Sequence, residues 1–207
     1  SRRALVGGGR ARLGIRCPLG GERPAVLMRF TVGGASAGSY GKTTTTSMVA
    51  WSLSEAGLDR TVVVGGRVGT MGGSNARVGR SDFLVVEADE SDGSFLRLNP
   101  LVAIITNIDA DHLENYGGDF ARVQAAFAEF LHRLPFYGLA VLCIDDAEVA
   151  MLAADTSRHM MTYGFAEHAD VRAENVTQDG GCMRFTLRLP DDSHTAIELA
   201  LPGRHNV

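Results

Sequence analysis

The chain has 207 residues, a net charge of −4 and a hydrophobic content of 45%, so it has enough apolar material to form a core. Its pI near 5.8 gives no basic surface for nucleic acid. Its longest apolar run, residues 136–144, is far shorter than the roughly 20 residues of a membrane span. We therefore expect neither a nucleic-acid partner nor a membrane-bound form.

The N-terminal stretch, residues 1–30, follows no sustained period and is rich in arginine and glycine. We interpret it as a linker, an arm or the tail of a preceding domain, with a short apolar helix or linker over residues 24–30. Residues 31–207 form the main predicted domain. Its first strand, residues 31–37, is expected to be weak because of two glycines at its centre.

A phosphate-binding loop is predicted directly after this strand, because small residues let backbone N–H groups turn towards an anion and the next helix adds its own N–H groups. Lys42, the only lysine, would reach the terminal phosphates, and the Thr43 hydroxyl would bind Mg²⁺. The strict motif lacks its first glycine, which is Ser36 here, but the shorter G-x-x-G-K-T-T is complete. A capped helix after a flexible turn is the alternative. The predicted nucleotide contacts are Gly38, Ser39, Tyr40, Gly41, Lys42, Thr43 and Thr44.

The next segments alternate between strand and helix patterns. The first helix, from Thr43, should place Val49, Ala50, Leu53 and Ala56 on one face and end before Gly57. A second helix, residues 120–134, is capped by Asp119 and carries a continuous apolar face. The predicted strands are residues 61–65, 83–87, 101–106 and 139–144, and the further helices are residues 120–134 and 146–154. This rhythm favours a mostly parallel sheet.

After residue 160 the long helices stop. Strand patterns over residues 170–176, 182–189 and 195–201 are separated by turns, and the second alternates apolar with polar side chains. The predicted fold class is therefore α/β: a phosphate-loop-type, mostly parallel sheet flanked by helices, with a small antiparallel section near the C-terminus.

The three cysteines are odd in number and have neither metal-ligand nor redox spacing. Cys143 and Cys182 lie in apolar strand patterns, so we expect core residues of a reduced, cytoplasmic protein, whereas Cys17 precedes the predicted domain.

Polar clusters follow three of the buried strands, and the carboxyl ends of parallel strands meet at one end of a sheet. These clusters are the phosphate loop, residues 87–92 and residues 107–112. Glu87 is the first acid after its strand and is the preferred carboxylate ligand for Mg²⁺, with a solvated acidic loop as the alternative. His112 is a further candidate ligand, for Mg²⁺ or Mn²⁺, although an isolated histidine is more often structural.

These stretches together resemble the Mur ligases, which build the peptide stem of bacterial cell-wall precursors. The resemblance covers residues 24–207, with matching runs at 38–46, 87–95, 106–112, 135–138 and 202–206. It implies a central ATP-binding domain over residues 31–207, truncated at its C-terminal end, without the family's C-terminal ligase domain. Within the family, the chain is most similar to the branch that joins L-alanine to the lactyl carboxylate of UDP-N-acetylmuramate through an acyl phosphate.

The resemblance also implies roles for single residues. Lys42, Glu87 and His112 would serve catalysis, and Thr43, Glu87 and His112 would hold the metal, Mg²⁺ or Mn²⁺. Asn206 would contact the adenine of ATP. The chain departs from the family at Ser39-Tyr40, where Thr-His is usual, and its single lysine leaves none to be carbamylated as a metal ligand.

Three other functions compete with this interpretation. A ligase of the same family that recycles wall peptides shares the loop, and a nucleotide-binding module that is inactive on its own fits a fragment. A kinase remains open, whereas a switch GTPase is disfavoured because its Asn-Lys-x-Asp motif needs a second lysine.

Overall fold

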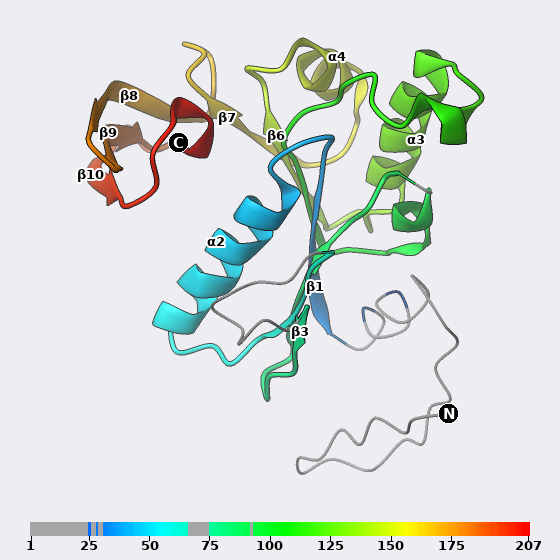
Figure 1. The fold of residues 1–207 in the computed structure, drawn as a ribbon, viewed down its shortest axis with the longest axis horizontal. Coiled ribbons are helices and arrows are strands. Elements are labelled where there is room, and N and C mark those ends of the chain that lie inside the picture. Colours follow the sequence, from blue (N-terminus) through cyan, green and yellow to red (C-terminus); the bar gives the residue numbers. More distant parts are fainter. Residues whose placement is uncertain (1–24, 26–27, 29–30, 66–74, 92) are drawn as a thin grey trace.

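The structure, a computed structural model, describes residues 25, 28, 31–65, 75–91 and 93–207. Its described strands form one sheet in the order β10-β9-β8-β7-β6-β5-β1-β4-β2-β3 (Figure 1). In chain order they are β1 (Val32–Ala37), β2 (Thr61–Val63), β3 (Ala76–Arg77), β4 (Phe83–Glu87), β5 (Val102–Ile105), β6 (Leu139–Cys143), β7 (Met160–Gly164), β8 (Val171–Asp179), β9 (Cys182–Arg188) and β10 (His194–Leu199).

The predicted mixture of parallel and antiparallel pairing is confirmed. Pairing is parallel from β2 through β4, β1, β5, β6 and β7 to β8. It is antiparallel between β8, β9 and β10, and between β2 and β3 at the other edge. The alternating side chains of β9 therefore belong to a hairpin section, as the sequence predicts.

Helices cover both faces of the sheet (Figure 1). On one face, Ala50 of α2 packs with Val62 and Val64 from β2 and its end. On the other, α3 and α4 form the main core with the sheet. The described helices are α2 (Lys42–Glu55), α3 (Phe120–His132) and α4 (Ala147–Asp155), with 3-10 turns η2 (Ser94–Arg97), η3 (Leu113–Tyr116) and η4 (Arg204–Asn206). No helix in the described part of the chain is both long and apolar enough to span a membrane.

The predicted helix signals are confirmed at α3. The Asp119 carboxylate accepts a hydrogen bond from the N–H of Ala121 at 3.0 Å and caps the helix. The predicted apolar face is buried, and the rings of Phe127 and Phe130 lie 5.4 and 5.0 Å from that of Phe95. These three side chains are fully buried and anchor the core below the strand ends.

The face predicted for α2 is partly wrong. Ala50 is buried, but the second buried side chain is Thr46, and Ala56 is exposed. Thr46 and Ala50 are four residues apart and small, so they let α2 lie close on β1 and β4. Gly57 has a φ of 78° and ends the helix, as predicted.

Three further expectations are corrected. Strand β7 is absent from the predicted set because its Met-Met-Thr-Tyr-Gly sequence lacks a clear period, yet it pairs in parallel with β6. Strand β3 is also absent from the predicted set of strands. Cys143 and Cys182 are half-buried free thiols rather than core residues, although burial raises the pKa of Cys143. Cys17 and most of residues 1–30 lie outside the described residues.

Candidate functional site

The phosphate loop lies between the end of β1 and the start of α2 and is shorter than the strict motif. Ser36 belongs to β1, where it is paired with Glu87 and Ile104, so no loop glycine is needed there. Gly41 has a φ of 81° and forms the N-cap of α2. A Cβ on Gly38 would lie 2.1 Å from Oγ1 of Thr106, so this position accepts only glycine without rearrangement. The chain therefore turns from strand into helix within four residues, 38–41.

Lys42 begins α2 and turns its ammonium group back into this loop. Its Nζ donates to the carbonyl oxygens of Gly38 at 2.6 Å and Ser39 at 3.2 Å. It also pairs with the Glu90 carboxylate, whose oxygens lie 3.0 and 2.9 Å away. Glu90 is buried, and a buried carboxylate is stable only with such a partner. The sequence does not single out Glu90, because the acidic run offers several carboxylates and order along the chain favours Glu87.

Thr43 and Glu87 meet as the sequence predicts. The Thr43 hydroxyl lies 2.9 and 3.0 Å from the two carboxylate oxygens of Glu87. The backbone N–H of Gly65, after β2, donates to the same carboxylate at 2.9 Å. Glu87 is thus held between the ends of β4 and β2, and its carboxylate oxygens face the first turn of α2.

Asn107 ties the loop to the end of β5. Its Oδ1 accepts the N–H of Tyr40 at 2.8 Å, and its Nδ2 donates to the Tyr40 carbonyl at 3.0 Å. Ser39 makes a second link, since its Oγ accepts the N–H of Asp109 at 2.8 Å. Thr106 adds a third by donating to the Tyr40 carbonyl at 2.8 Å. These contacts with the segment after β5 fix the shape of the loop. In the sequence, the only signal for them is a polar run after a buried strand.

Tyr40, the residue that departs from the family pattern, faces the same neighbouring segment. Its ring is exposed, and the negative charge of Asp111 raises the pKa of its hydroxyl. His112 comes next along the chain, as the N-cap of η3, and has a left-handed conformation with φ 53°. Its ring nitrogens lie 3.8 Å from Asp111 and 3.7 Å from Glu114. The structure thus puts His112 among exposed carboxylates, beside the segment that holds the loop.

The two remaining predicted residues differ in position. Thr44 lies in the first turn of α2, directly after the loop. Asn206 lies in η4 near the C-terminal end of the chain, where its Nδ2 donates to the Pro202 carbonyl at 2.7 Å. The adjacent Arg204 packs over the ring of Phe165 at 4.0 Å. The described hydrogen bonds of Asn206 therefore stay within residues 202–206, whereas Arg204 contacts the β7–β8 side of the sheet, and the contact of Asn206 with adenine stays a prediction.

The residues at the loop fit a magnesium–nucleotide complex. Mg²⁺ takes one or two carboxylates together with phosphate oxygens, and Glu87 with the Thr43 hydroxyl supplies such a pair of oxygen ligands. The ammonium group of Lys42 lies in the same loop and would offset the charge of the phosphates. Within residues 31–65, 75–91 and 93–207, no three or more His, Cys, Asp or Glu side chains are grouped as a metal site. The place of His112 in a metal site therefore stays a prediction.

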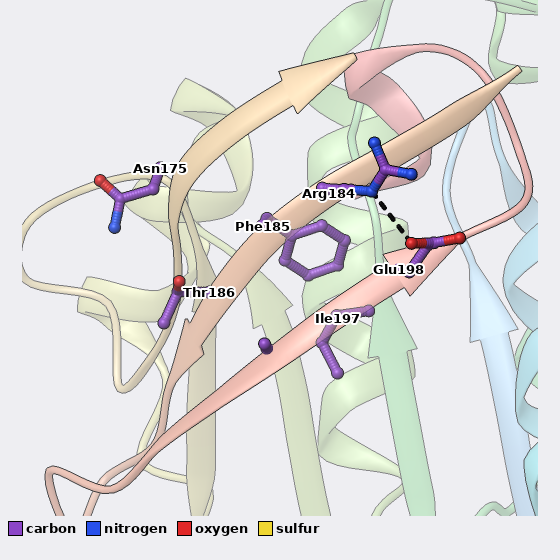
Figure 2. A pocket seen from close by; sticks show the side chains of 7 residues that line it. Asn175, Arg184, Phe185, Thr186, Ile197 and Glu198 are labelled. Carbon is purple, nitrogen blue, oxygen red and sulfur yellow. Dashed lines mark hydrogen bonds and ion pairs between the residues drawn. The ribbon is translucent and has the colours of Figure 1, made fainter. Parts of the chain in front are cut away.

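Two hollows lie outside the loop itself. A small one, of about 150 Å³, adjoins Glu87 between the end of β2 and η2. A wider and open one, of about 340 Å³, lies on the hairpin section of β8, β9 and β10, where Arg184 pairs with Glu198 at 2.9 Å beside Phe185 and Ile197 (Figure 2). The wider hollow contains none of the predicted site residues, so volume alone does not locate the site.

The sheet order, the short loop and the Lys-Thr start of α2 define an α/β domain of phosphate-loop type. Sequence comparison gives its family. The chain belongs to the Mur ligase family, since the model of the Mur ligase middle domain matches residues 37–207.

Relatives with high identity carry one name. The chain is 70% identical over 183 residues to a UDP-N-acetylmuramate–L-alanine ligase of Xanthomonas axonopodis pv. citri (strain 306), which covers 88% of this chain. It is 69% identical over the same length to the enzyme of that name from Xanthomonas oryzae pv. oryzae (strain PXO99A). The chain spans only 38% of the length of these relatives.

Solved structures agree on the fold. The UDP-N-acetylmuramate-alanine ligase of Thermotoga maritima superposes with a TM-score of 0.74 at 29% identity, covering 87% of this chain and 40% of that one. The UDP-N-acetylmuramate:L-alanyl-gamma-D-glutamyl-meso-diaminopimelate ligase of Neisseria meningitides gives 0.76 at 26% identity, covering 88% of this chain and 61% of that one.

Proposed function

We propose that this chain is the ATP-binding part of a cytoplasmic ligase that joins L-alanine to the lactyl carboxylate of UDP-N-acetylmuramate, with ADP and phosphate as products. The observation that carries the proposal is the meeting of Lys42, Thr43 and Glu87 at the ends of β1 and β4. The choice of substrates is supported by the 70% identity to a UDP-N-acetylmuramate–L-alanine ligase.

In the first step, two anions must meet, because ATP phosphorylates the lactyl carboxylate to an acyl phosphate. In the second step, the amine of alanine displaces phosphate from the acyl phosphate and forms the amide. The ammonium of Lys42 would offset the charge on the transferred phosphoryl group. The N–H groups of the loop and of α2 would hold the other phosphate oxygens. Thr43, Glu87 and His112 would hold Mg²⁺ or Mn²⁺, which screens the phosphates when bound.

Phosphate release tests the proposal. The longer protein that contains this chain should release phosphate from ATP only when both UDP-N-acetylmuramate and L-alanine are present, and Lys42→Ala should abolish this release. Equal release with neither substrate present would overturn the ligase function. Release by the Lys42→Ala variant at the normal rate would remove the loop from the mechanism.

A ligase that recycles wall peptides is the second candidate. The solved structure of a ligase whose name includes the tripeptide L-alanyl-gamma-D-glutamyl-meso-diaminopimelate superposes with a TM-score of 0.76. The amine acceptor separates the two functions. Supplying L-alanyl-γ-D-glutamyl-meso-diaminopimelate in place of L-alanine should give no phosphate release if the chain is alanine-adding, and preferential release with the tripeptide would reverse the assignment.

We further propose that the chain binds nucleotide but does not form the amide by itself, since it spans 38% of the length of its relatives and ligation by domain closure needs groups from elsewhere. The same assay on the 207-residue chain should show no substrate-dependent turnover, while calorimetry should detect MgADP binding.

A further inference from the structure

The ammonium group of Lys42 has no free donor for a phosphate. A lysine carries three N–H donors. In the structure they meet the carbonyls of Gly38 and Ser39 and the carboxylate of Glu90. A phosphate that binds to Lys42 must therefore replace at least one of these partners. The two carbonyls belong to the backbone of the loop, so Glu90 is the partner that a side-chain rotation can release.

The backbone of Glu90 is held at this position by hydrogen bonds. Only 4% of its surface is exposed, and its backbone carbonyl accepts hydrogen bonds from the N–H of Gly93 at 3.0 Å and from the hydroxyl of Tyr116. Tyr116 belongs to η3, which begins directly after His112. The backbone of Glu90 is thus fixed by two neighbouring segments, and only its side chain is able to move away from Lys42.

We propose that Glu90 is a positioning residue that holds Lys42 in the nucleotide-free site and is exchanged for a phosphate oxygen when the nucleotide binds. This inference rests on the proposed nucleotide-binding function of the loop. Before nucleotide binds, Glu90 keeps the ammonium pointing into the loop and neutralises its charge. The ion pair must be broken on binding, so it lowers nucleotide affinity.

The sign of the effect follows from charge and burial. Breaking a buried ion pair costs free energy, and the Glu90 carboxylate stays buried close to an incoming anion. Glutamine has nearly the same shape and still accepts a hydrogen bond from Lys42, but carries no charge. Glu90→Gln should therefore bind MgADP about tenfold more tightly, a change of about 1.4 kcal/mol.

Calorimetric titration of the full chain with MgADP tests this effect. Asp89→Asn is the matched control, because it removes the same charge from the neighbouring exposed residue, and its affinity should change by less than about twofold. In a Lys42→Met background there is no ion pair to break, so the gain from Glu90→Gln should be smaller than in the wild-type background. Unchanged or weaker binding by Glu90→Gln, or an equal gain in Asp89→Asn, would overturn the proposal.

The single lysine provides a test without nucleotide. Selective ¹⁵N labelling of lysine side chains should give one ammonium resonance for this chain, and exchange with water should be slow because the pair is buried. Glu90→Gln should shift this resonance and speed its exchange, while Glu90→Asp, which keeps the charge, should fall in between. An identical resonance in all three proteins would show that Lys42 does not pair with Glu90. Failure of wild-type chain to bind MgADP would instead contradict the proposed function.

Discussion

At the scale of residues, the candidate site is a set of polar groups that form hydrogen bonds and ion pairs with one another. The Thr43 hydroxyl bonds to Glu87, and the Lys42 ammonium bonds to Glu90 and the loop. Glu87 is the last residue of β4 and Glu90 lies three residues further on, yet Glu87 faces the hydroxyl and Glu90 the ammonium. The two carboxylates therefore have separate tasks: one fits a metal ligand, and the other positions a cation.

Replacing Thr43 tests the hydroxyl as a metal ligand. Thr43→Ala should weaken MgADP binding by about tenfold or more, since outer and inner ligands of a metal each contribute on this scale. Thr43→Ser keeps the hydroxyl and should bind almost normally. Calorimetry with MgADP and with ADP in EDTA measures the difference. The loss should disappear in EDTA, and an equal loss there would assign Thr43 to the phosphates or the fold instead.

The pKa of Tyr40 tests the contact between the loop and the segment after β5. The charge of Asp111 raises this pKa, so neutralising Asp111 should lower it. The tyrosinate absorbance of wild-type chain minus that of Tyr40→Phe isolates Tyr40. In Asp111→Asn the same difference should show titration at lower pH, because the anion no longer faces a carboxylate. An unchanged midpoint would place Tyr40 away from Asp111 in solution.

At the scale of elements, α3 anchors the core beneath the site. Phe127 and Phe130 pack on Phe95 of η2, which directly follows the acidic run of Glu87 and Glu90. The same cluster contains sheet residues from β1, β4 and β5. Packing of α3 therefore supports the strand ends that carry the site.

Phe127→Ala should lower the free energy of unfolding by about 3–5 kcal/mol, because the side chain is fully buried and leaves a cavity. Phe136→Ala is the matched control: Phe136 is 87% exposed, so its loss should change stability by less than about 0.5 kcal/mol. Denaturant unfolding at equilibrium measures both. Similar losses in the two variants would show that the Phe95–Phe127 cluster is not a main source of stability.

Elements with a strong local signal were predictable from the sequence, and those set by neighbours were not. β4 matches its predicted bounds, and α3 begins after its Asp119 cap, because apolar runs and caps are local properties. β7 has no such pattern and exists through its pairing with β6 and β8. Likewise, the Thr43–Glu87 contact follows from strand order, whereas the burial of Glu90 depends on the turn that follows it.

At the scale of the whole molecule, the sheet order explains why distant segments form one site. β5, β1 and β4 are adjacent and parallel, so residues 38–41, 87–91 and 107–112 leave the sheet at the same end. The hairpin section of β8, β9 and β10 lies three strands further along the sheet from β5 (Figure 1). A ligand at the loop should therefore affect the first three segments together and leave the hairpin section unaffected.

Hydrogen–deuterium exchange measured by mass spectrometry tests this coupling. MgADP should slow exchange in residues 38–46, 87–91 and 107–112, because the loop is hydrogen-bonded to Asn107 and Asp109 and the Thr43 hydroxyl is hydrogen-bonded to Glu87. Residues 171–199 should exchange at the same rate with and without nucleotide, and Lys42→Ala should abolish every difference. Protection confined to residues 38–46 would mean that the loop binds nucleotide without the neighbouring strand ends, whereas protection of all three segments requires that they act as one site.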